Sequence, residues 1–115
     1  MKKSFVLLII LNFLNAYSQN YTRSSQIVFD EASSVGKLAT LTTQYRGISS
    51  RGPDMIECQS YNNNNVMVLS FKTGHKEIIN KLALGDWINV EFRITRVSDT
   101  AIYGRLMSIT PTKEP

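Results

Sequence analysis

The side chains with the greatest capacity for binding chemistry in this sequence are aromatic and basic. Aromatic rings provide flat faces on which the rings of a ligand stack, and Lys or Arg side chains pair with its negative charges. The candidates for stacking are Trp87, Tyr103, Tyr45 and Tyr61, and those for charge are Lys72, Arg93, Arg96, Arg105 and Arg46. The predicted binding residues are Tyr45, Arg46, Arg51, Tyr61, Trp87, Arg93, Tyr103 and Arg105. The alternative is that the rings cover the ends of the fold and the Arg side chains form a solvated surface.

Residues suited to catalysis or to metal binding are scarce. Cys58 and His75 are the only Cys and His, so a nucleophile and base pair rests on one instance of each. We predict instead that Cys58 is a small buried hydrophobe, with a reactive or intermolecular thiol as the alternative, and that His75 is exposed or caps a helix. The sequence has no pair of Cys or His residues to bind a structural zinc ion. The spacing of its acidic residues Asp30, Glu31 and Asp54 is not that of an EF-hand calcium site. The sequence therefore predicts no catalytic residue, metal or cofactor, and indicates a protein that is not an enzyme.

The N-terminal residues have the pattern of a secretory signal peptide. Lys2 and Lys3 precede an apolar run over residues 5–14, and Ala16 and Ser18 place small residues before a cleavage site between Ser18 and Gln19. The apolar run is too short to span a bilayer, which needs about 20 such residues, so a retained anchor or a buried segment is the weaker interpretation. We predict a periplasmic or secreted protein with no stable membrane anchor after cleavage.

The predicted cleavage changes both the length and the net charge of the protein. Removing 18 of the 115 residues leaves 97, which is enough for one small domain. Two of the 13 basic residues lie in the signal, so 11 remain against nine acidic ones and the net charge falls from +4 to +2. This mild balance does not by itself indicate a nucleic-acid or membrane partner. The single Cys forms no intrachain disulfide, so an apolar core must stabilise the domain.

Short β-type runs separated by turn residues dominate the rest of the chain. They predict an all-β fold, a small barrel over residues 37–110 with one short helix, in the order β-β-β-α-β-β. Residues 19–36 form an N-terminal tail or an added strand with one apolar docking point at Ile27, Val28 and Phe29, and residues 111–115 form a C-terminal tail. The predicted strands are residues 38–45, 55–61, 66–72, 88–95 and 101–110, and the predicted helix is residues 75–84.

The last two strands orient several of the candidate binding residues. Apolar residues alternate with polar ones from Ile88 to Ile94, so one side faces a core and places Trp87 and Arg93 together on the other. Tyr103 and Arg105 share one side of the final strand. Gly104 between them marks a bend or a close approach of another backbone. The run of Asn at residues 62–65 suits a hairpin tip, and equally a binding loop.

The passage from Val68 to Ile94, with Gly85-Asp86 where the predicted helix turns into a strand, resembles small bacterial OB-fold proteins, including single-stranded DNA-binding proteins and their relatives. The order of the elements over residues 37–110 agrees with this resemblance. It implies a five-stranded barrel whose helix joins the third and fourth strands. For an exported protein it implies a ligand such as an oligosaccharide, a small cation or a protein partner.

Three functions remain open at this point. The first is an exported, non-enzymatic OB-fold-like module that binds a protein, an oligosaccharide or another oligomeric ligand across its strands and loops. The second is single-stranded nucleic-acid binding on the same surface, with affinity that falls steeply as salt rises. The third is a structural or assembly subunit of the cell envelope that uses strand addition at a free edge.

Overall fold

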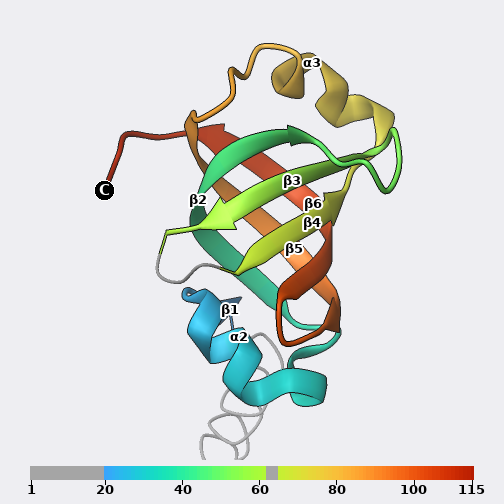
Figure 1. Cartoon of the computed structure of the whole chain (residues 1–115), viewed down its shortest axis with the longest axis vertical. Coiled ribbons are helices and arrows are strands. Elements are labelled where there is room, and N and C mark those ends of the chain that lie inside the picture. Colours follow the sequence, from blue (N-terminus) through green and yellow to red (C-terminus); the bar gives the residue numbers. More distant parts are fainter. Residues whose placement is uncertain (1–19, 62–64) are drawn as a thin grey trace, which may run out of the picture.

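The computed structural model describes residues 20–61 and 65–115 and shows a small β-barrel with short helices at two places (Figure 1). The predicted signal peptide and its cleavage site lie outside the described residues, as does most of the Asn run. Among the residues that are described, no helix is long and apolar enough to cross a membrane.

Five strands close into the barrel. They are β2 (Leu38–Ile48), β3 (Met55–Ser60), β4 (Val66–Ser70), β5 (Trp87–Val97) and β6 (Ala101–Pro111). Their order is β2-β3-β4-β6-β5, and pairing between β2 and β5 closes the circle. β4 and β6 run parallel, whereas the other barrel pairs are antiparallel. The predicted barrel of five strands is therefore confirmed.

The interior of the barrel is filled by alternate residues of each strand. On β5, Ile88, Val90, Phe92 and Ile94 are almost completely buried, as their period of two predicts. Gly104 allows β6 to pass close to this row, because a Cβ at that position would lie 2.4 Å from Cδ2 of Phe92. The same Cβ would lie 3.0 Å from the backbone carbonyl oxygen of Arg93, so of the two alternatives predicted for Gly104 the close approach of another backbone is confirmed.

The helical segments differ from the prediction of one helix over residues 75–84. Between β4 and β5 the chain forms a 3-10 turn, η2 (Thr73–His75), and the short helix α3 (Lys76–Ile79). Ile79 is buried, whereas Leu84 is 75% exposed, so the apolar stripe that predicted a longer helix does not all face the core. Gly85 has φ +91°, which suits the sharp turn from this segment into β5.

A second helix covers the end of the barrel beside the start of β2, and the prediction of a single helix is wrong on this point (Figure 1). The chain forms β1 (Asn20–Tyr21), which pairs with β2 in parallel, then α2 (Ser24–Asp30) and the 3-10 turn η1 (Glu31–Ser34). Ile27 is fully buried in the core while Phe29 is 89% exposed. The hydroxyls of Ser24 and Ser60 lie 2.6 Å apart and join α2 to β3.

Candidate ligand-binding face

The outer surface of β4, β6 and β5 carries two rows of facing side chains, which we call the β6 face. In the first row, Tyr103 of β6 lies between Val68 of β4 and Arg96 of β5. In the second row, Arg105 of β6 lies between Ser70 of β4 and Arg93 of β5. Because side chains alternate along a strand, Tyr103 and Arg105 point away from the core, as the sequence predicts.

Two guanidinium groups contact the ring of Tyr103. The Cζ atom of Arg96 lies 4.0 Å from the ring centroid, and Cζ of Arg51 lies 5.1 Å from it. Nη1 of Arg51 also donates a hydrogen bond to the Tyr103 hydroxyl. Cations at these distances are attracted to the electron-rich ring face, so the three side chains hold one another in place.

The loop between β2 and β3, residues 49–54, positions Arg51. Ser49 is buried, and its backbone N–H donates to the carbonyl of Met55 at 2.8 Å, which closes the loop at its base. The hydroxyl of Ser49 accepts a hydrogen bond from the backbone N–H of Arg51 at 3.2 Å. The loop conformation is therefore fixed by local bonds, and it carries Arg51 over the β6 face.

A shallow pocket of about 320 Å³ lies beside Tyr103. Its lining includes the side chains of Met55, Val68, Ser70, Thr95 and Arg96. Apolar, hydroxyl and guanidinium groups thus meet at one aromatic ring. Such a mixture suits a ligand with a flat ring and a negative charge.

Positive charge predominates on the β6 face. It carries the guanidinium groups of Arg51, Arg96, Arg105 and Arg93, and Lys72 follows β4 at its edge. Within residues 20–61 and 65–115, none of these four guanidinium groups forms an ion pair with a carboxylate. Glu57 of β3 is the acidic residue in line with the first row, and Val68 separates it from Tyr103.

The other predicted binding residues lie elsewhere. Tyr61 and Trp87 form an edge-to-face pair with ring centroids 6.0 Å apart, which the sequence did not predict. Arg46 is exposed on β2. Tyr45 is 5% exposed and lies in the core, where burial raises the pKa of its hydroxyl, so it offers no free ring face for stacking. The alternation of Ala39, Leu41, Thr43 and Tyr45 along β2 is the sequence signal that places Tyr45 inside.

Arg96 contacts the Tyr103 ring but is not among the predicted binding residues. The turn at residues 98–100 joins β5 to β6, and Val97 pairs with Ile102 directly beside it. Counting outward from this turn brings Arg96 opposite Tyr103. The hairpin register was therefore the signal that would have found it.

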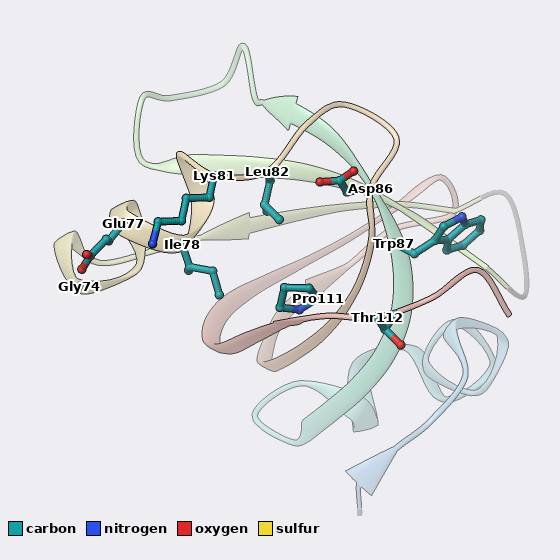
Figure 2. A pocket seen from close by; sticks show the side chains of 9 residues that line it. All are labelled: Gly74, Glu77, Ile78, Lys81, Leu82, Asp86, Trp87, Pro111 and Thr112. Carbon is teal, nitrogen blue, oxygen red and sulfur yellow. The ribbon is translucent and has the colours of Figure 1, made fainter.

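A separate cavity of about 730 Å³ lies beside α3 and has Trp87 at the end opposite that helix (Figure 2). Its floor includes Ile78, Leu82 and Pro111. Its charged side chains are of both signs, since Glu77 and Asp86 accompany Lys81. The cavity therefore lacks the excess of positive charge found on the β6 face.

The two residues considered as a nucleophile and a base make the following contacts. Cys58 is fully buried, and this burial raises the pKa of its thiol to about 12, so it packs as the predicted buried hydrophobe. A ring nitrogen of His75, Nε2, lies 3.2 Å from the carbonyl oxygen of Met107. In the described part of the chain, no three side chains of His, Cys, Asp or Glu are grouped to hold a metal ion.

The comparisons with known proteins identify the fold alone. No protein-family model matches the chain, and no curated protein matches its sequence. In structure, the chain is similar to a Leishmania major protein described as an aspartyl-tRNA synthetase, with a TM-score of 0.53 and 14% identity. The match covers 85% of this chain but 21% of that one. Together with the strand order, this likeness defines an OB-fold-like β-barrel.

Proposed function

We propose that this protein is an exported, non-enzymatic OB-fold-like module that binds an anionic oligomer across the β6 face. The observation that carries the proposal is that the guanidinium groups of Arg51 and Arg96 both lie close to the ring of Tyr103. Arg51 belongs to the loop after the first barrel strand, and Arg96 lies next to the turn between the last two strands. OB-folds bind oligonucleotides and oligosaccharides with these two loops and the face of the second and third strands, of which β4 belongs to the β6 face.

The charge of the β6 face selects for an anionic ligand. Arg105, Arg93 and Lys72 extend the positive surface away from Tyr103 along β6. A ligand with one ring against Tyr103 and negative groups at intervals meets both features. An acidic oligosaccharide is the first candidate, because residues 1–18 predict export and the OB-fold resemblance implies an oligosaccharide among the ligands of an exported protein.

Single-stranded nucleic acid is the second candidate. An aromatic ring accompanied by Arg side chains is the platform on which bases stack while their phosphates are neutralised. The similar structure is named as an enzyme that acts on tRNA, which agrees with this candidate. Counterion release would make this binding strongly salt-dependent.

Strand addition at a free edge is the least supported of the three functions. Each of the five barrel strands pairs with a neighbour on both sides. The barrel therefore leaves little unpaired backbone for a partner strand.

Binding to a labelled sulfated hexasaccharide and to labelled oligo-dT tests the proposal. We expect saturable binding of one probe. Tyr103→Ala, which removes the stacking ring, or Arg51→Ala, which removes a cation beside it, should weaken this binding about tenfold or more. Arg46→Ala is the matched control, because it removes an exposed Arg outside the β6 face. Equal losses in Arg46→Ala and Arg51→Ala would contradict the assignment of the face.

Export is tested separately by cell fractionation and N-terminal sequencing. We expect the protein in the periplasm or medium with Gln19 as its first residue. A cytoplasmic protein that begins at Met1 would contradict the export part of the proposal and leave the binding face unaffected.

A further inference from the structure

A second, smaller pocket lies beside Arg105 on β6, two residues along the strand from Tyr103. It has a volume of about 280 Å³. Basic side chains from β5, β6 and the segment after β4 surround it, together with two apolar residues of β6. The lining residues are Lys72, His75, Arg93, Arg105, Leu106 and Met107.

Arg93 and Arg105 are direct cross-strand partners in the antiparallel pair of β5 and β6. Like charges at such positions destabilise a sheet. The nearest acidic residue on the outer side of β5 is Glu91, which lies opposite Ser108 and not opposite an Arg. In the described residues neither Arg forms an ion pair with a carboxylate, so the protein does not neutralise the like charges of this cross-strand pair.

The walls of this pocket are held in place. Nη1 of Arg93 donates to the carbonyl oxygen of Gly36 at 2.6 Å, which anchors that guanidinium while its other N–H groups stay free to donate. His75 is held against the carbonyl of Met107 through Nε2. Lys72 adds a third positive charge at the rim.

We propose that this pocket binds a single oxyanion group, a phosphate or a sulfate, between Arg93, Arg105 and Lys72. Guanidinium forks match the geometry of such anions, and two forks with an ammonium group supply donors for several oxygens at once. The bound anion also offsets the repulsion between Arg93 and Arg105. The proposal rests on the proposed function in one respect, since the anion would be a substituent of the oligomer whose ring contacts Tyr103.

Urea unfolding of the whole protein with and without inorganic phosphate tests this pocket. An anion that binds the folded protein alone raises the urea midpoint in a saturable way. Arg105→Gln should weaken phosphate binding about tenfold or more, because it removes one of the two forks. The same substitution should raise the urea midpoint in the absence of phosphate, because the like-charge contact is gone.

Arg46→Gln is the matched control for the loss of one positive charge. A chloride solution of equal ionic strength is the control for the general effect of salt. A phosphate effect that is the same in Arg105→Gln and Arg46→Gln would overturn the proposal, as would the absence of a saturable effect. Glucose 6-phosphate and free phosphate distinguish the sources of the anion. Tighter binding of the sugar ester supports a substituent of an oligomer, and equal binding supports the free anion as the ligand.

The outcomes also separate this pocket from the proposed function. Loss of oligomer binding in Tyr103→Ala, together with phosphate binding that Arg105→Gln leaves unchanged, would retain the β6 face and remove the oxyanion pocket. Phosphate binding that depends on Arg105, with no binding of either oligomer, would retain the pocket and remove the proposed function.

Discussion

Replacement of Gly104 by Ala tests how tightly β6 is held against the barrel core. A Cβ at this position would lie 2.4 Å from Cδ2 of Phe92 and 3.0 Å from the carbonyl oxygen of Arg93. Ordinary carbon–carbon contacts are about 3.5–4.0 Å, so the fully buried Phe92 ring must move by about 1 Å. Overpacking of a core costs about 1–3 kcal/mol, and the lower entropy of unfolded Ala offsets about 0.4–1 kcal/mol of this.

We therefore expect Gly104→Ala to lower the free energy of unfolding by about 1–2 kcal/mol, or the Tm by roughly 5–15 °C. Thermal and urea unfolding followed by circular dichroism measures both quantities. Gly74→Ala is the matched control, since nothing lies within 4 Å of its added Cβ, and it should change stability by less than about 0.5 kcal/mol. Equal stabilities of the two variants would refute the close approach of Gly104 to Phe92. Because Gly104 faces Phe92 in the core, its neighbours Tyr103 and Arg105 face outward.

Three further predictions concern the core and its titrating groups. Burial raises the pKa of Cys58 from 9.0 to about 12, and burial with the 2.5 Å hydrogen bond to Asp30 raises that of Tyr21 from 10.0 to about 12. Ionisation therefore favours the unfolded chain, so these two groups should lower the urea midpoint from about pH 9 to about pH 12, less steeply in Tyr21→Phe. A midpoint that stays level over this range would contradict the prediction. At neutral pH the Cys58 thiol should react with a thiol reagent only as the protein unfolds, and rapid labelling of folded protein would show that it is accessible. In urea unfolding, Ile27→Ala should lower the free energy of unfolding by about 2–4 kcal/mol and Phe29→Ala by less than about 0.5 kcal/mol. Similar values for the two variants would mean that α2 does not dock through Ile27.

The barrel could be predicted because its strands carry local signals. The alternation from Ile88 to Ile94 fixes which side of β5 faces the core, and Gly104 marks where β6 passes close to it. The helices were harder to predict. The stripe that ends at Leu84 suggested a helix much longer than α3, because periodicity does not show which apolar residues find a packing surface. α2 was missed because its Ser-rich start resembles a loop, and burial of Ile27 is what stabilises it.

The candidate site could be predicted in its residue types but not in its grouping. Arg51 and Tyr103 were both chosen as binding residues, yet their contact depends on the conformation of a loop 52 residues away in the chain. Sequence spacing carries no information on such a long-range contact. The pairing of Tyr61 with Trp87 was unpredictable for the same reason. The prediction of Tyr45 as a binding residue was wrong, although the alternation on β2 indicates its burial.

A map of backbone amide chemical shifts during titration with the sulfated hexasaccharide and, separately, with oligo-dT would show where on the barrel an anionic oligomer binds. We predict that one of these anionic oligomers causes saturable shifts grouped at Arg51, Arg96 and Tyr103, because the ligand lies over that ring. Shifts grouped instead at Trp87 and α3, around the cavity of Figure 2, would contradict the account, and so would the absence of saturable shifts with both probes.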